Sequence, residues 1–341
     1  MKLGQAFDPR HNALNLWRLI LATGVIFWHS FPLTGNTIDF QPAVRLLSEV
    51  WVDGFFTVSG FLITASWMRR PHLGEYWRAR FLRIFPGLWV CVAVTAFVIA
   101  PIAAAVKHSS LPLSAEFAYV VNNGLLNVFY AGINGTPKDI PWPGVWNGSL
   151  WTLVFELLCY IAVCVLGVLG LLKRQWVLPT LFVASAVWSA YVSYTTMAQQ
   201  TIPQMLARFA VVFLAGALIH QYRDAIPAHW SLVALCGVIV IASGFAQNYR
   251  LIAALPLAYA IIVSGALVRR FPLRNDISYG MYIYAFPVQQ VLVMAGLATL
   301  APLLFFGLST IFTFPLAAAR WFLVEKRAMR MKYLLRGTDP L

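Results

Sequence analysis

The chain has 341 residues, of which 60% are hydrophobic and only 11% are charged, whereas a soluble globular domain has about 25% charged residues. So few charges cannot cover a water-exposed surface, which excludes a soluble protein. The formal net charge is +13, yet the basic residues form short clusters between apolar runs rather than one polar face, so we do not expect a nucleic-acid partner. We expect an all-α membrane bundle in a single domain, 1–341, with its transmembrane core at about 13–324.

Apolar windows of about 20 residues, the length needed to cross a bilayer, predict about ten transmembrane helices. The windows cover 13–32, 50–68, 84–106, 148–171, 176–196, 204–221, 229–246, 250–268, 278–297 and 302–323. The segment before the first window lacks the pattern of a cleaved signal peptide, so we expect the first helix to remain as an anchor. The four cysteines lie inside apolar runs without metal-ligand spacing, so we expect neither a disulfide framework nor a bound metal.

The basic residues between the windows predict the orientation of the chain. With both termini in the cytoplasm, eighteen lysines and arginines fall on the cytoplasmic side and five on the other, as the positive-inside rule requires. One missing or extra helix would invert every later connection, so this asymmetry supports ten crossings. We expect a basic cytoplasmic tail at about 325–341 and no appended soluble domain.

Two connections are longer than the rest. The inner one, about 69–83, mixes aromatic and charged residues in a helical pattern typical of an amphipathic helix at the membrane interface. The outer one, about 107–147, contains Pro137, Pro141 and Gly144 and indicates an ordered cap rather than a domain.

Ionisable residues inside apolar helices are costly and often functional. Arg18 and His29 are eleven residues apart, which is about three helical turns, so both side chains lie on one face and about 16 Å apart along the axis. This predicts a polar stripe that connects the two leaflets. The alternative is that each side chain snorkels to its own membrane surface.

Glu156 lies about two turns below the outer entrance of its helix, the depth predicted for His29. A carboxylate there would orient the imidazole and stabilise its protonated form. The alternative is a structural ion pair with Arg208, which lies one turn into its helix from the same side.

Three arginines precede the third window. Arg80 and Arg83 share a helix face at i and i+3, and Arg78 lies beside them. Planar guanidinium groups bind two phosphate oxygens at once, so this group predicts a phosphate site. The alternative is plain positive-inside topology.

Two further segments carry candidate polar residues. Asn275 or Asp276 is expected to cap the N-terminus of the ninth helix, and Tyr279 to lie in an interfacial aromatic belt. Asp53 is expected to cap the outer end of the second helix, where Gly54 and Gly60 permit close helix packing.

Several runs together resemble the integral-membrane acyltransferase type 3 family, in order and over nearly the whole chain. They are Arg18 with His29, VDGFFTVSGFLI, RFLRIFP, SLWTLVFELLCY, RFAVVFLAGALI, DISYGMYIYAFPVQQ and WFLVEKRAMR. The resemblance implies ten core helices in the inner (plasma) membrane and transfer of acetyl or other short acyl groups from acyl-coenzyme A to hydroxyls of extracytoplasmic or lipid-linked carbohydrates.

The resemblance also implies roles for residues. His29 corresponds to the family's essential histidine, Arg18 to its paired basic residue, and Arg80 and Arg83 to its cytoplasmic arginine motif. We expect Glu156 to act with His29 and Arg18 in catalysis and Tyr279 to lie near the donor. The residues expected to bind the acceptor are Asp53, Ser59, Trp151 and Arg208. Other members place a histidine where this chain has Ala285, so we expect the ninth helix only to pack.

The resulting hypothesis is that the phosphates of acyl-coenzyme A, which the resemblance favours as acetyl-coenzyme A, bind Arg78, Arg80 and Arg83, with Tyr279 nearby. The thioester would reach His29, which acts as general base or accepts the acyl group itself. No permanently bound cofactor is expected. Two other classes remain open: a transporter or lipid flippase that uses the same polar path, and a sensor or scaffold without chemistry.

Overall fold

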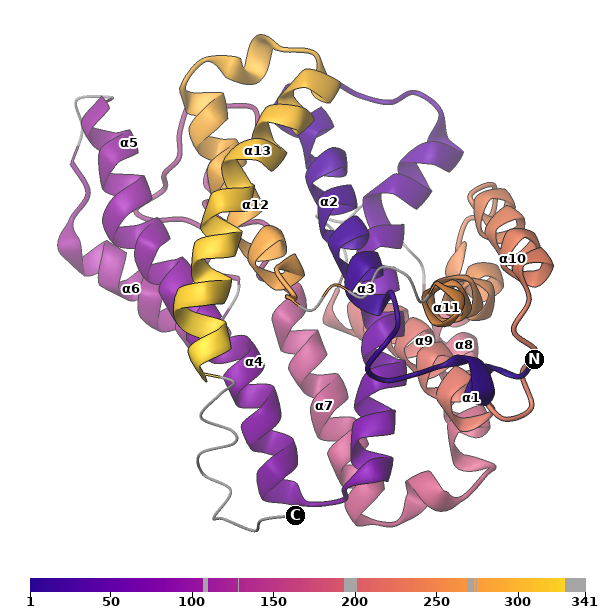
Figure 1. Cartoon of the computed structure of the whole chain (residues 1–341). Helices are drawn as coiled ribbons and strands as arrows, with labels where there is room; N and C mark the ends of the chain where they lie inside the picture. Colours follow the sequence, from indigo (N-terminus) through magenta and orange to yellow (C-terminus); the bar gives the residue numbers. More distant parts are fainter. Residues whose placement is uncertain (107–109, 128, 193–200, 269–272, 274, 329–341) are drawn as a thin grey trace. The chain divides into compact units, whose positions relative to one another are not determined.

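The computed structural model describes residues 1–106, 110–127, 129–192, 201–268, 273 and 275–328, and 75% of these described residues are helical (Figure 1). Within these ranges the chain forms no strand, which confirms the all-α prediction. Lys107, Arg269, Arg270 and Arg274, which entered the orientation argument, lie outside the described residues, as does the tail from residue 329 onward.

Every apolar window contains a helix. The ten helices are α2 (Leu14–Leu33), α3 (Gln41–Arg69), α4 (Leu73–Val94), α7 (Thr152–Val168), α8 (Val177–Tyr191), α9 (Ile202–Gln221), α10 (Trp230–Ser243), α11 (Arg250–Leu267), α12 (Ser278–Met294) and α13 (Pro302–Arg320). Among the described residues, six spans are long and apolar enough to cross a membrane: α2, α3, Leu73–Val106, α9, α11 and Pro302–Ala328. Ten crossings and two cytoplasmic ends stay predictions.

The helix predicted at about 69–83 forms from Leu73 onward, and it continues without a break into the third apolar window. Arg70 is extended before Pro71, as the residue preceding a proline usually is, and α4 starts at Leu73. From there the helix continues through the π-helical turn η1 (Thr95–Ile99) and α5 (Ala100–Val106). Pro86 lies inside this helix and does not end it. The arginines therefore occupy the first turns of a long apolar helix.

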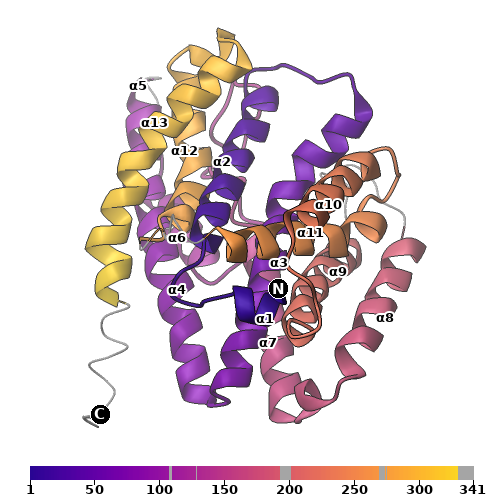
Figure 2. The ribbon, with the colours of Figure 1, turned by 45° about the vertical axis from the view of Figure 1, so that its right-hand side comes forward.

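The chain divides into two compact units. The first contains Met1–Leu21, Ile38–Leu73 and Phe155–Arg274. In it α3 packs along α9, and α11 packs against α3, α9 and α10 (Figures 1 and 2). The short helix α1 (Leu3–Ala6) and the 3-10 turn η2 (Leu171–Lys173) also belong to it. Leu21, Val58, Tyr249 and Leu257 lie in its apolar core.

Glycines bring α3 and α9 into backbone contact. A Cβ atom at Gly60 would lie 1.9 Å from the backbone oxygen of Phe213, and one at Gly216 would lie 2.0 Å from the oxygen of Thr57. Small residues allow such close approach of membrane helices. This confirms the close packing predicted for Gly60.

We expect Gly60→Ala to lower the yield of folded protein, because the methyl group meets backbone that cannot rotate away. The matched control is Gly237→Ala in α10, where nothing lies within 4 Å of the added Cβ. Size-exclusion profiles and apparent unfolding temperatures in detergent would compare the two variants. Equal behaviour of both would contradict this account of the α3–α9 contact.

The second unit contains Ala22–Thr37, Gly74–Val154 and Asn275–Leu341. In it α12 packs against α13, and η1 packs against α6 (Leu113–Gly124) and α12. Nearly every residue of α12 is buried, and Phe286 lies in an apolar cluster with Leu33 and Phe305. A Cβ at Gly280 would lie 2.8 Å from Cα of Ala317, so α12 and α13 also approach closely.

The outer connection forms a cap built from α6 and a run of turns. Trp146 is buried, and its indole N–H donates to Thr136 Oγ1 over 3.0 Å. The side-chain amide of Gln290 in α12 donates to the backbone oxygens of Trp142 and Val145 over 2.9 and 2.7 Å. The cap is thereby fixed to α12, and it presents Trp142 to the neighbourhood of His29.

Candidate functional site

His29 lies near the end of α2 in an aromatic frame within the second unit. Its ring meets Phe286 edge-to-face with centroids 5.1 Å apart and Trp142 at 6.0 Å, and these two rings are themselves 5.4 Å apart. The side chain is only 9% exposed. Among the described residues nothing hydrogen-bonds its Nδ1, which is buried.

Leaving a buried polar atom without a partner costs about 1–3 kcal/mol. Such an atom in a native structure calls for an explanation, and a catalytic role is one of the recognised ones. An imidazole held by aromatic rings keeps its orientation without a hydrogen bond at Nδ1. Among the described residues, nothing therefore competes for this nitrogen in a reaction.

The helix that carries His29 is fixed to α12 on both sides of that residue. Gln289 Nε2 donates to the backbone oxygen of Ile26 over 3.1 Å and to Ser30 Oγ over 3.2 Å. Gln289 and Ser30 are fully buried. Since Phe286 and Gln289 both come from α12, this helix positions the His29 imidazole, in agreement with the packing role expected for it.

The arginines of the predicted phosphate site lie on the first turns of α4. The guanidinium of Arg80 lies 5.1 Å from the ring centroid of Tyr76. Arg83 Nη2 forms an ion pair with Asp276 Oδ2 over 2.9 Å, with the side chains 23% and 8% exposed. Asp276 also accepts the N–H and the hydroxyl of Ser278 through Oδ1. Asp276 therefore contacts the first residue of α12 and also binds Arg83, but the N-cap residue of α12 is Ile277, one position after the predicted cap.

Tyr279 is buried rather than part of an interfacial belt. It is 8% exposed, its hydroxyl donates to the backbone oxygen of Ile84 over 3.1 Å, and the guanidinium of Arg320 lies 4.2 Å from its ring centroid. Arg320, 3% exposed, pairs with Glu325 over 3.0 Å. A Cβ at Gly87 would strike the Arg320 guanidinium, so this glycine makes room for it.

The sequence missed the Arg320–Glu325 pair for a geometric reason. Residues five apart on an α-helix lie about 140° apart around the axis. The chain, however, forms the π-helical turn η5 at Trp321–Glu325, whose wider i→i+5 closure brings such residues together. No local sequence signal marks that turn.

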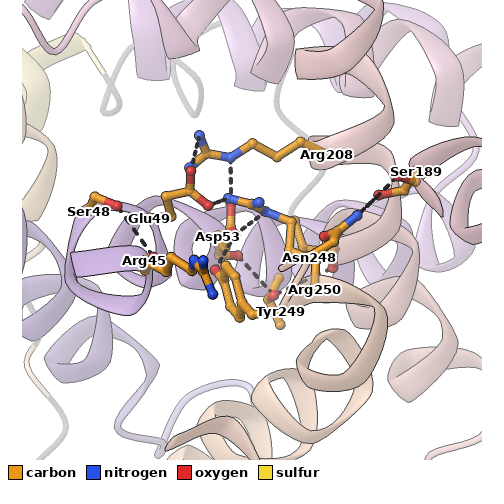
Figure 3. A network of polar contacts seen from close by, with 11 residues as sticks. Arg45, Ser48, Glu49, Asp53, Ser189, Arg208, Asn248, Tyr249 and Arg250 are labelled. Carbon is orange, nitrogen blue, oxygen red and sulfur yellow. Dashed lines mark hydrogen bonds and ion pairs between the residues drawn. The ribbon is translucent and has the colours of Figure 1, made fainter. Parts of the chain in front are cut away.

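In the first unit, Asp53 and Arg208 are brought together in a buried ionic cluster (Figure 3). Asp53 Oδ1 accepts from Arg208 Nε over 3.1 Å, and both side chains are fully buried. Asp53 Oδ2 accepts from Arg250 Nε over 2.6 Å and from the hydroxyl of Tyr249. The prediction that Asp53 caps a helix is wrong, because α3 begins at Gln41 and Asp53 lies in its middle.

Glu49 completes this cluster from one turn before Asp53. It pairs with Arg250 Nη2 and lies 3.9 Å from Arg208 Nη1. The two carboxylates and two guanidinium groups balance in charge, which a buried cluster requires. Glu49, Tyr249 and Arg250 were not among the predicted site residues. The i, i+4 spacing of Glu49 and Asp53 was the available signal, but the predicted window starts after Glu49.

Glu156 has partners on α7 and α3. Oε1 accepts from the hydroxyl of Tyr160, one turn along the same helix, and Ser59 Oγ lies 3.5 Å away, at the outer limit of a hydrogen bond. Ser59 and Glu156, both predicted, are thus neighbours. Arg208 pairs with Asp53 and Glu49, whereas the sequence left open a pair with Glu156.

Two further predicted residues, Arg18 and Trp151, are neither fully buried nor fully exposed. Arg18 is half-buried on α2, the same helix as His29, and Trp151 is half-buried immediately before α7. Since Glu156 and His29 belong to different units, their predicted pairing stays a prediction. Within the described ranges, no group of three or more histidine, cysteine, aspartate or glutamate side chains is placed to hold a metal ion.

Comparison with known proteins gives a family and two curated relatives. The sequence model of the acyltransferase 3 family, described as "Acyltransferase domain", matches residues 11–321. A protein of Shigella phage Sf6 named O-acetyl transferase is 28% identical, with 97% of this chain and 98% of that protein covered. Nodulation protein 10 of Rhizobium leguminosarum bv. viciae is 26% identical, with 94% of each covered. No solved structure matches the chain.

Proposed function

Because the chain belongs to the acyltransferase 3 family and is a membrane O-acyltransferase, we propose that it moves an acetyl or other short acyl group from cytoplasmic acyl-coenzyme A to a carbohydrate hydroxyl. The acceptor is an extracytoplasmic or lipid-linked glycan, and the location is the inner (plasma) membrane. The name of the phage relative specifies O-acetyl transfer, which supports acetyl as the group moved.

The observation that carries this proposal is the setting of His29. A general base must be held in place and must have a nitrogen that other protein groups do not occupy. The rings of Phe286 and Trp142 hold the imidazole, and in the described part of the chain nothing hydrogen-bonds its Nδ1. A sensor or scaffold would have no use for this arrangement.

The proposed reaction balances without a further reagent. The oxygen of the acceptor hydroxyl bonds to the carbonyl carbon of the thioester while its proton passes to His29. The carbon–sulfur bond breaks, and the thiolate takes the proton back from the imidazolium. The products are an ester, a free thiol and neutral His29. Mass analysis of rapidly quenched protein distinguishes this route from one in which His29 itself carries the acyl group.

The arginines of α4 are proposed to bind the donor phosphates. Arg78, Arg80 and Arg83 lie within two turns of one another, and guanidinium groups suit phosphate oxygens. Arg83 already binds Asp276, so a phosphate would share or replace that partner.

We expect Arg80→Ala to raise the KM for acyl-coenzyme A about tenfold, because a hydrogen bond to a charged group contributes about 1.5–3 kcal/mol, with little change in kcat. Arg174→Ala, at an exposed arginine after η2, is the control. Arg83→Ala should also lower the apparent unfolding temperature, since it breaks the pair with Asp276. Initial rates over a range of donor concentrations measure the effect, and an unchanged KM for Arg80→Ala would reject this donor site.

The proposed function is tested by comparing surface glycans from cells with and without the gene by mass spectrometry. The proposal predicts an added acyl group only when the gene is present. Identical glycans in both cells would contradict it.

A further inference from the structure

A polar cavity lies entirely within the first unit and involves none of the residues discussed above as catalytic or donor-binding. It encloses about 600 Å³, within the usual range for small-molecule sites and far more than one small anion needs. Its walls come from α1, the ends of α3 and α9, η2 and the turn after α9.

Cationic side chains from three separate connections converge on this cavity. Arg69 ends α3, Lys173 ends η2 and Arg223 follows α9, and all three line the cavity. Asp224 is its one acidic lining residue, and that side chain is 80% exposed. The lining therefore carries an excess of positive charge.

A histidine in the cavity wall is held neutral and in one tautomer. Arg223 Nη1 lies 2.6 Å from Nε2 of His220. An arginine can only donate, so Nε2 accepts and the imidazole proton resides on Nδ1. The His220 ring packs edge-to-face on Phe61 with centroids 5.5 Å apart. His220 thus orients Arg223 rather than adding charge.

Buried polar atoms with no partner point to a ligand. Thr64 lines the cavity, is 2% exposed, and its hydroxyl has no hydrogen-bond partner among the residues the structure describes. The buried Oε1 atom of Gln221, another lining residue, also has no hydrogen-bond partner among the described residues. Cations at helix C-termini also complement the helix dipole, but that role needs neither a cavity nor an unsatisfied hydroxyl.

We propose that this cavity binds a phosphate ester, with Arg69, Lys173 and Arg223 facing the phosphate and Thr64 donating a hydrogen bond. Charge-assisted hydrogen bonds to arginine and lysine favour phosphate. Apolar lining residues such as Phe7, Met68 and Leu172 add surface for the rest of the molecule. A lipid headgroup and a soluble phosphate ester share this chemistry.

The test measures binding to the purified full chain in detergent, without any acyl transfer, so its outcome is independent of the proposed reaction. The probes are phosphatidylglycerol, followed by native mass spectrometry, and glycerol 3-phosphate, followed by equilibrium dialysis. The variants are Arg69→Gln with Lys173→Gln, and Thr64→Val. The control is Arg174→Gln, an exposed arginine next to Lys173 that does not line the cavity.

We expect binding to weaken about tenfold for each cation removed and about tenfold in Thr64→Val, with Arg174→Gln unchanged. Thr64→Val removes a hydroxyl that has no partner within the part of the chain that the structure describes, so the unfolding temperature of this variant should match the wild type even where the charge variant is unstable. Binding of phosphatidylglycerol alone identifies a lipid site, and comparable binding of glycerol 3-phosphate identifies a soluble ester. The proposal is overturned when neither probe binds or when Thr64→Val binds the probes as tightly as the wild type. It is also overturned when Arg174→Gln loses as much binding affinity as the cavity variants.

Discussion

Replacing His29 by alanine is expected to reduce acyl transfer by about 10²- to 10⁴-fold, the usual contribution of a general base, while the protein still accumulates in the membrane. His29→Gln is the sharper variant. It keeps a polar side chain between Phe286 and Trp142 but cannot take up a proton near neutral pH. The rate of thiol release from acyl-coenzyme A in the presence of an acceptor measures the effect.

The control for this prediction is His11→Ala. His11 is 62% exposed, and its Nδ1 lies 2.9 Å from Asp8, so its removal should leave the rate unchanged. Wild-type rates in His29→Gln would show that the imidazole takes no part in proton transfer. Loss of the protein from the membrane in both His29 variants would instead assign the residue a role in folding.

The second large effect is expected from Asp53→Asn. Asp53 is fully buried and accepts from Arg208, Arg250 and Tyr249. The asparagine amide carries no charge, so the two buried guanidinium groups of Arg208 and Arg250 would share a single carboxylate, that of Glu49. Breaking a buried ion pair costs about 3–5 kcal/mol, so the variant should unfold at a clearly lower temperature or fail to accumulate. Asp39→Asn, at an exposed position, is the control.

A double variant tests whether the loss of stability comes from the unbalanced charge in the cluster. Asp53→Leu with Arg208→Met removes one charge of each sign and should destabilise less than the sum of the two single changes, because contacting residues are coupled. Apparent unfolding temperatures of the four proteins in one detergent measure the coupling. Additive losses would contradict a shared cluster.

The helix positions could be predicted from the sequence because a membrane-crossing helix needs a long apolar run, and that requirement is local. Each of the ten windows contains a helix. The boundaries were less predictable where polar residues are buried. The window at 50–68 excludes Glu49, yet α3 begins at Gln41, and Arg208 and Arg250 neutralise Glu49 within the folded unit.

The partners of the candidate site residues could not be predicted, because they are set by tertiary contacts. Asp276 was expected to cap a helix, and one of its oxygens does accept from Ser278 at the start of α12, but the N-cap is Ile277 and the second oxygen of Asp276 binds Arg83, which lies far away in the sequence. In the same way, the aromatic frame of His29 combines Trp142 from the cap with Phe286 from α12. Composition and spacing indicated which residues were costly to bury, and only the fold shows what each one contacts.

The most direct test uses the purified protein in liposomes with labelled acetyl-coenzyme A and a carbohydrate acceptor. An O-acyltransferase that uses this donor releases one free thiol for each ester formed, and His29→Gln abolishes both products together. Movement of the acceptor or donor across the bilayer, with no thiol released and no ester formed, would contradict the proposed reaction.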